Sequence, residues 1–346
     1  MKSIVSIIFG MVMAVVFSGC SAIDEDLSDC DETLKLDYEL HLVTNLSIEL
    51  QKELDKKTDA RLLEALRRYL SPVFSDYAHD LDLSFYDTQG DFARLHHEQH
   101  QMDANEMSYT LYIPYRDYMH LATANVDGNG IVTQEGGDHC RTAQFLQSRS
   151  DTISTHKTGL FTAREAIRMK KNDDQTIFVR LYMANCAAGL ILDTSKATLK
   201  DLKVFATGFA TSFNIADSSY VYSERPPMIV TDKINTGSDN QQCFCIVNFP
   251  SKNPSGPSTR LVTEVEDPRA SIDAPDALWE LHVYAFLADG TVTKSVIGVK
   301  NPLLAAQLKI LHARMSSDGS LESDEPGLAV SVTLDWKEAG HHEVPL

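Results

Sequence analysis

Nine segments of the chain place apolar or aromatic residues at every second position. They are residues 35–43, 79–87, 107–115, 176–184, 199–209, 243–249, 278–287, 292–299 and 328–336. Side chains two apart lie on the same face of a strand, so each segment predicts a β-strand with one face in a core. Turn-rich stretches separate these segments, and none alternates regularly with a long helix. The pattern predicts a mainly β fold, a sandwich or a barrel, and not a doubly wound sheet.

Two segments show helical spacing. Residues 58–70 place leucines along one side, with Thr58 or Asp59 able to cap the start and Pro72 just beyond the end. Residues 301–315 show similar spacing, with a proline in the first turn. We predict that both segments form short helices packed against sheets.

The amino terminus resembles a bacterial lipoprotein signal. After Lys2, residues 4–17 form an apolar run of roughly fourteen residues, within the range of a signal-peptide core and too short to span a membrane comfortably. Ser18 and Gly19 are small, and Cys20 follows directly. We predict that residues 1–19 are removed between Gly19 and Cys20 and that the Cys20 thiol is acylated, for instance with palmitate. The alternative is an ordinary secretory signal with an incidental cysteine. Two or three acyl chains would anchor the chain stably.

Residues 20–33 are acidic and offer little to bury, so we predict a solvated tether between the lipid and the folded body. The chain has 31 basic and 49 acidic residues and a formal net charge of -18. This charge argues against nucleic acid and against electrostatic adhesion to anionic lipid, so the lipid on Cys20 must hold the membrane. About 325 mature residues suggest two domains. A polar stretch at 169–175 places them at 34–172 and 173–346. Within the first, a long irregular region is expected at 132–157.

The remaining cysteines number five, which cannot all pair with one another. They are Cys30, Cys140, Cys186, Cys243 and Cys245. Cys30 with Cys140 is the preferred disulfide, because both lie in polar surroundings in the first predicted domain, but spacing does not decide connectivity. Cys186 lies in an apolar run and is predicted to be a buried hydrophobe. Cys243 and Cys245 would share one face of a strand.

Candidate metal and catalytic motifs fail on their spacing. Residues 125–130 open like a calcium loop, but Gly136 occupies the position that needs a bidentate glutamate, so a hairpin turn is the better interpretation. The histidines of 95–100 lack the His-Glu-x-x-His order of a zinc protease and are interpreted as a solvated hairpin or loop. Trp279 and Trp336 are interpreted as packing residues and not as sugar platforms. We predict no cofactor, no metal site and no catalytic residue.

Four parts of the sequence resemble one family. They are Cys20 followed by EDLSDC ending at Cys30, HDLDLSFYDTQGDF at 79–92, MSYTLYIPYRDYMHLAT at 107–123 and AVSVTLDW at 329–336. Together they resemble the anchoring subunits of type V fimbriae in Bacteroidales, the FimB-like major and minor fimbrium anchors.

The resemblance implies two transthyretin-like β-sandwich domains and a structural, non-enzymatic role. It implies an outer-membrane lipoprotein facing the cell exterior that anchors, and can terminate, a fimbrial polymer. Its partners would be fimbrial stalk or accessory subunits, contacted by strand exchange. Residues 328–336 are a candidate strand, although completing their own domain is the favoured interpretation of this segment. The alternatives are a surface glycan-binding lipoprotein, favoured by an exposed Trp279 or Trp336, and a lipid-tethered enzyme, favoured by a pocket with two close carboxylates.

Overall fold

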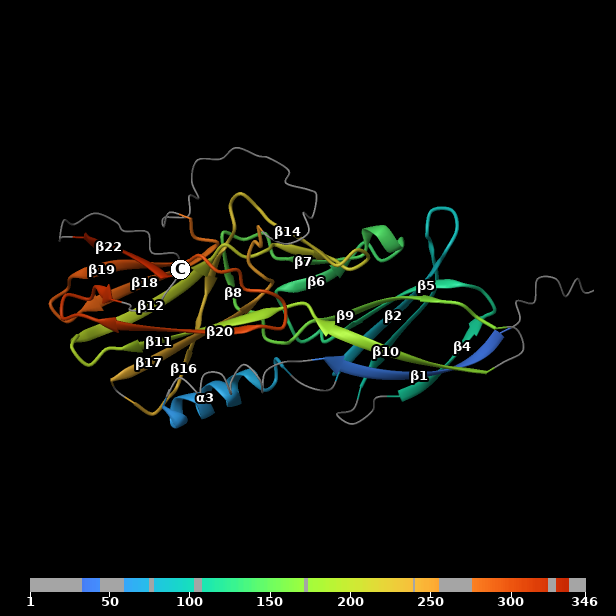
Figure 1. Ribbon diagram of the computed structural model, residues 1–346, viewed down its shortest axis with the longest axis horizontal. Helices are drawn as coiled ribbons and strands as arrows, with labels where there is room; N and C mark the ends of the chain where they lie inside the picture. The colour runs from blue at the N-terminus through green and yellow to red at the C-terminus, as the bar shows by residue number, and fades with distance from the viewer. Residues whose placement is uncertain are drawn as a thin grey trace, which may run out of the picture.

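The computed structural model describes residues 33–43, 59–74, 78–102, 108–170, 174–238, 240–254, 276–322 and 328–335. The molecule is elongated, with two groups of strands arranged along its longest axis and the helix α3 beside one of them (Figure 1). Strands dominate because the alternating segments bury one face each, as in β1, where every second residue from Leu34 to Leu42 is buried.

The first sandwich is one seven-stranded sheet that bends into two leaves. Its order is β3 (Arg94–Gln101), β2 (Asp80–Asp87), β5 (Tyr118–Ala124), β9 (Phe161–Ile167), β10 (Gln175–Met183), β1 (Thr33–Val43) and β4 (Ser108–Pro114). Only two residue pairs join β9 to β10, so the leaves can separate there. Tyr38 on β1 meets His120 on β5 across the core, with the hydroxyl 2.5 Å from Nε2. The two leaves therefore face each other.

The seven-stranded sheet includes a strand that lies beyond the predicted boundary at 172/173. Strand β10 lies beyond that boundary, yet it pairs in parallel with β1 over eight positions, from Leu36 with Gln175 to Val43 with Tyr182. The next strand, β11 (Cys186–Asp193), belongs to another sheet. We therefore propose that the first sandwich ends after Met183.

The second sandwich packs a five-stranded sheet against a six-stranded one. The five-stranded order is β16 (Asp232–Ile234), β17 (Gln241–Asn248), β11, β20 (Leu308–Met315) and β21 (Leu321–Glu322). The six-stranded order is β22 (Leu328–Asp335), β19 (Val292–Val299), β18 (Trp279–Leu287), β12 (Leu199–Thr207), β15 (Met228–Val230) and β8 (Thr152–Ser154). The core between them includes Leu190, Phe244 and Trp279. Cys186, Cys243 and Cys245 are buried, and the last two share a face as predicted.

Helix α3 (Ala60–Leu70) forms where the leucine spacing predicts it. The Asp59 carboxylate accepts the Arg61 main-chain N–H at 2.8 Å and caps the start. The buried leucines join the cluster that contains Cys243 and Ile310 of the five-stranded sheet. That sheet is therefore covered on one face by the six-stranded sheet and on the other by a helix from the first half of the chain, beside β16 and β17 (Figure 1).

A four-stranded sheet draws strands from both halves of the sequence. Its order is β14 (Ser219–Val221), β13 (Ser212–Asn214), β7 (Gln144–Gln147) and β6 (Val132–Glu135). Its core joins Phe145 and Phe213 to Tyr86 and Leu121 on the outer face of the first sandwich. In Figure 1 this sheet lies along the top of the molecule, between the two sandwiches.

Two sequence-based expectations are wrong. Residues 301–315 were expected to be helical, but 308–315 form β20, which pairs in parallel with β11 over seven positions. Residues 132–157 were expected to be irregular, but they form β6, β7, the short 3-10 turn Cys140–Thr142 and β8. In both places pairing with distant strands outweighs the local preference.

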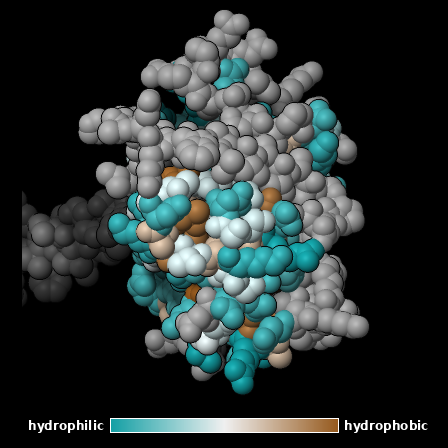
Figure 2. Space-filling view, turned by 90° about the vertical axis from the view of Figure 1, so that its left-hand side faces the viewer, coloured by the Kyte–Doolittle hydropathy of each residue, from teal (hydrophilic) through white to brown (hydrophobic). Residues whose placement is uncertain are grey.

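The surface at the end of the second sandwich is mixed in character. Viewed from that end, hydrophilic residues dominate the described surface, and hydrophobic ones are scattered among them in small areas (Figure 2).

Trp279 lies in the core of the second sandwich. It is fully buried, and its Nε1 donates to the Asn301 carbonyl at 3.1 Å. The prediction that Trp279 is a packing residue is confirmed.

Candidate functional site

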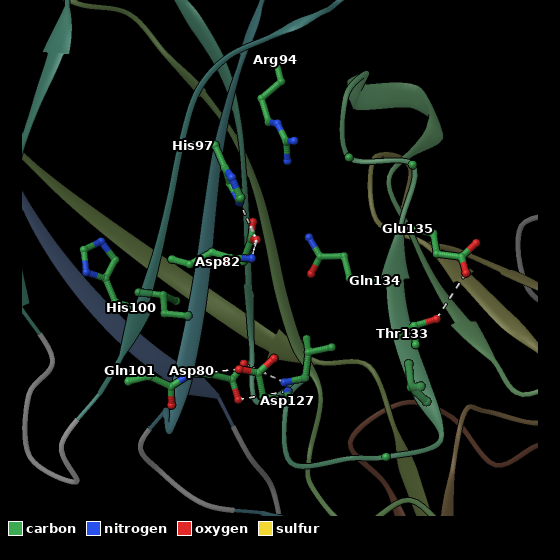
Figure 3. Close-up of a pocket in the computed structure, with 17 residues that line it drawn as sticks. Asp80, Asp82, Arg94, His97, His100, Gln101, Asp127, Thr133, Gln134 and Glu135 are labelled. Carbon is green, nitrogen blue, oxygen red and sulfur yellow. Dashed lines mark hydrogen bonds and ion pairs between the residues drawn. The ribbon is translucent and has the colours of Figure 1, made fainter.

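A polar groove lies between the outer face of β2 and β3 and the strand β6 (Figure 3). Its volume is about 860 Å³. The lining residues are Asp80, Leu81, Asp82, Arg94, His97, Gln99, His100, Gln101, Val126, Asp127, Gly130, Val132, Thr133, Gln134, Glu135, Gly136 and Gly137. They come from segments up to 57 residues apart, so only the folded chain brings them together.

The floor of the groove is a hydrogen-bonded group on β2 and β3. One carboxylate oxygen of Asp82 lies 2.7 Å from His97 Nε2 and accepts the Gln99 amide at 2.9 Å. Asp82 and Gln99 are direct partners in the strand pairing, which sets their side chains on one face. These hydrogen bonds fix the side chains of Asp82, His97 and Gln99 on the outer face of the sheet.

The lower wall is the loop that follows β5. Asp80 accepts main-chain N–H groups from Val126 at 2.8 Å and Asp127 at 3.3 Å. Burial raises the pKa of Asp80, and these two N–H groups oppose the shift. Gln101 donates to the Asp127 carboxylate at 3.0 Å and joins the loop to β3. Asp80 therefore shapes the loop.

The residues of this loop that resemble a calcium-binding motif make hydrogen bonds that hold the loop in place. Asn125 has a positive φ of 65° and its amide oxygen accepts the His79 N–H at 2.7 Å. The Asn129 amide nitrogen lies 3.3 Å from the Thr158 hydroxyl. Among the described residues, no three His, Cys, Asp or Glu side chains are grouped so that they could hold a metal ion.

The opposite wall is β6, which is fixed at two points. The Thr123 hydroxyl on β5 donates to the Gln134 side-chain oxygen at 2.6 Å. Beyond β6 the chain returns to β3 through an isolated antiparallel bridge between Ala93 and His139. The Arg94 guanidinium also contacts the Asp138 carboxylate at 3.0 Å. This bridge closes one end of the groove.

Gly136 makes the closing turn possible. Its φ is +68°, and a Cβ placed there would lie 2.1 Å from the Thr142 carbonyl oxygen. Any side chain would therefore clash with backbone, and only glycine fits. The neighbouring Gly137 carbonyl accepts the Tyr86 hydroxyl at 2.9 Å.

The histidine segment is the second strand of the β2–β3 hairpin, so of the two interpretations from the sequence the hairpin is the one observed and the loop is not. In β3 the residues alternate between partly buried and exposed, but both faces are polar, so the apolar signal of a strand is missing. Glu98 contacts His96 at 2.7 Å and His100 at 2.9 Å. The groove residues on β3 were thus missed, although their spacing of two was visible in the sequence.

The carboxy-terminal strand β22 completes its own domain. It pairs antiparallel with β19 over eight positions, from Val292 with Asp335 to Val299 with Leu328. It is the outermost strand of the six-stranded sheet. Its main chain therefore offers one edge to a further strand within the part of the sheet that the structure describes.

Several residues singled out in the sequence lie outside the described residues. They are Gly19, Cys20, Cys30 and Trp336. Acylation at Cys20 and the disulfide between Cys30 and Cys140 stay predictions. Cys140 itself is buried, and its N–H donates to the Phe92 carbonyl at 3.0 Å beside the start of β3. Burial raises the pKa of the Cys140 thiol.

No family model matches the sequence, and no curated protein matches it by sequence. Solved structures do match. A candidate adhesin from Bacteroides ovatus has 13% identity and a TM-score of 0.50, with 86% of this chain and 97% of that chain covered. A candidate adhesin from Bacteroides thetaiotaomicron has 11% identity and a TM-score of 0.50, with 87% and 97% covered.

This chain has the fold of these adhesins. The fimbrial anchor protein Mfa2 from Porphyromonas gingivalis is also similar, with 11% identity, a TM-score of 0.46, and 88% of this chain and 99% of that chain covered. The prediction of a mainly β fold with sandwiches and short helices is confirmed. The expected resemblance to anchoring subunits of Bacteroidales fimbriae is confirmed at the level of fold. A search of the described residues finds no helix with the length and hydrophobicity to cross a membrane.

Proposed function

We propose that this protein is a structural lipoprotein of the outer membrane that faces the cell exterior and anchors a fimbrial polymer. The observation that carries the proposal is a fold shared with Bacteroides adhesins in a chain whose sequence predicts a lipid at Cys20. The protein would contact stalk or accessory subunits through main-chain pairing at a sheet edge, and it would end the polymer because its own amino terminus is held by lipid.

The sheet edges support the mode of contact. Strands β22 and β4 are the last strands of their sheets. An edge strand presents unpaired N–H and C=O groups that a partner strand can satisfy. Strand β22 is paired with β19 at eight positions, and all of this pairing would have to be broken before β22 could be donated to another subunit. We therefore favour β22 as an edge that accepts a partner's strand.

A glycan-binding role is the second candidate. The buried Trp279 does not favour it, but three aromatic side chains are well exposed on the leaf formed by β10, β1 and β4. Tyr112 is 65% exposed, Phe178 68% and Tyr182 57%. Aromatic faces of this kind can stack on sugars. Loss of glycan binding in a Phe178→Ala variant would support this candidate.

A lipid-tethered enzyme is the third alternative. The groove holds several carboxylates, as an enzyme would need, but Asp80 and Asp82 already accept hydrogen bonds that shape its walls. The solved structures of similar fold are candidate adhesins and not enzymes. Both observations support a structural role.

The experiment compares cells that carry the wild type, Cys20→Ala, Cys30→Ala or no copy of the protein. We expect Cys20→Ala to lack acyl mass, to leave the membrane fraction and to release fimbriae into the medium. The Cys30→Ala variant should keep its lipid and its membrane location, because Cys30 lies outside the predicted signal and Cys20 is unchanged. Firmly attached fimbriae of normal length in cells without the protein would contradict the anchor assignment.

A further inference from the structure

Strand β6 presents a free edge to the polar groove. The Ser148 N–H donates to the Ile131 carbonyl at 3.0 Å, so residue 131 points its main-chain groups at β7. In an antiparallel pair the bonded positions alternate, so residues 133 and 135 also point at β7. The main-chain N–H and C=O of Val132 and Gln134 therefore point the other way. Both residues line the groove, and β6 is the last strand of its sheet.

The groove is predominantly acidic. Its lining carboxylates are those of Asp80, Asp82, Asp127 and Glu135. Among the described residues that line it, Arg94 is the one lysine or arginine, and Asp138 neutralises it at the closed end. Figure 3 shows Asp82 and Asp127 on the β2–β3 side of the groove, whereas Glu135 on β6 points away from Gln134 and toward Thr133. A cationic ligand complements this distribution of charge.

The shape of the groove suits an extended chain. The Ala93–His139 bridge joins its two sides at one end, and the walls are held in place by hydrogen bonds from Thr123 to Gln134 and from Gln101 to Asp127. No Phe, Tyr or Trp is among the described residues that line it, so the large aromatic platform typical of a sugar site is missing from this part of the structure. A polypeptide strand can use the free main-chain groups of β6, while its alternate side chains reach the carboxylates.

We propose that this groove binds an extended, lysine- or arginine-rich polypeptide segment, which pairs with the free edge of β6 and lies over β2 and β3. Main-chain pairing at Val132 and Gln134 supplies the alignment. Asp82 and Asp127 select basic side chains. The partner is defined by this chemistry, and the binding does not depend on the fimbrial assignment proposed above.

The test uses three blocked nine-residue peptides and the full chain from residue 20 with Cys20→Ser. One peptide alternates valine with lysine, the second alternates valine with glutamate, and the third is the lysine peptide with every main-chain nitrogen methylated. Fluorescence anisotropy should show binding of the lysine peptide that weakens as salt rises. The other two should bind at least about tenfold more weakly, because one lacks the charge and the other the donors.

Protein variants locate the site. Asp127→Asn should weaken binding of the lysine peptide by about threefold, whereas Glu64→Gln, on the exposed surface of α3 and not among the residues that line the groove, should not change it. Gln134→Pro and Gln134→Ala lose the same side chain, but only the proline also loses the main-chain N–H. Proline should therefore weaken binding by about fivefold more than alanine. Thermal unfolding checks that each variant is folded.

The methylated peptide keeps the test decisive if the proline variant does not fold, because it removes main-chain pairing on the unchanged protein. Equal binding of the lysine and glutamate peptides would overturn the charge assignment and the proposal with it. Equal binding of the methylated peptide would overturn strand pairing. Displacement of the bound peptide by a neutral oligosaccharide at the same site would favour a glycan in place of a polypeptide.

Discussion

The hydroxyl of Tyr69, near the end of α3, donates a 2.6 Å hydrogen bond to Asp232 on β16. The Lys157 ammonium contacts the same carboxylate oxygen at 2.7 Å. Tyr69 and Asp232 are 163 residues apart, so this contact ties the helix of the first half to a sheet of the second. Burial, followed by the nearby acidic groups, raises the pKa of Tyr69 well above its ordinary value, so the phenol stays protonated and remains a donor.

Replacing Tyr69 with Phe should lower the free energy of unfolding by about 1 kcal/mol, because the ring stays while one hydrogen bond to a charged partner is lost. Urea unfolding at pH 7 measures the change. Tyr115→Phe, at a more exposed tyrosine, is the control and should have no measurable effect. Equal stability of wild type and Tyr69→Phe would show that the bond adds nothing to the packing of α3.

Leu66→Ala should cost about 2–5 kcal/mol of unfolding free energy. Leu66 is fully buried and packs over Gly189 of β11 in the five-stranded sheet. A Cβ atom built on Gly189 would lie 3.7 Å from the Leu66 Cδ2 atom. Truncation leaves a cavity between helix and sheet. Arg68→Ala on the exposed side of the same helix should change stability by less than about 0.5 kcal/mol. Thermal and urea unfolding of both variants give the comparison.

The protein should lose stability as the pH falls from about 6.5 to about 4, at a rate of up to about 1.4 kcal/mol per pH unit for each buried histidine. Burial lowers the pKa of His120 to about 4 and that of His156 to about 3. An unfolded chain takes up protons on these imidazoles below about pH 6.5, whereas the folded protein does not. The unfolded state therefore binds more protons in this window.

His120→Gln should make the pH dependence of stability shallower between pH 6.5 and 4.5, even if the variant is less stable overall. His41→Gln, an exposed position on β1, should leave the slope unchanged. Urea unfolding at several pH values gives the slopes. An unaltered slope in His120→Gln would show that this imidazole does not couple stability to pH.

The predicted disulfide is tested by counting thiols. If Cys20 carries lipid and Cys30 pairs with Cys140, alkylation of the denatured, unreduced protein should label three cysteines, which are Cys186, Cys243 and Cys245. Labelling of five cysteines would contradict the pairing. Reduction before alkylation should raise the count from three to five, and mass spectrometry of the peptides identifies which thiols were freed.

The strands with one apolar face were predictable because their signal is local. In β1 and β10, alternation of side chains fixes the buried face within a few residues, and the structure follows it. Helix α3 was predictable for the same reason, since its leucines, its cap at Asp59 and Pro72 lie within fourteen residues. Strand β3 was not, because it is an edge strand with two polar faces.

Strand partners depend on residues far away in the chain. A local reading of 301–315 gives a helix, but parallel pairing with β11 makes 308–315 a strand, and burial on both faces of that sheet stabilises it. The groove has the same origin, since Asp82, Gln99 and Gln134 line one groove only after β6 folds back over β2 and β3. By itself the sequence determined the strands with an apolar face, one helix and the acidic charge, which are local properties. The tertiary structure alone decided which edges stay free and where the carboxylates gather, because both depend on long-range pairing and burial.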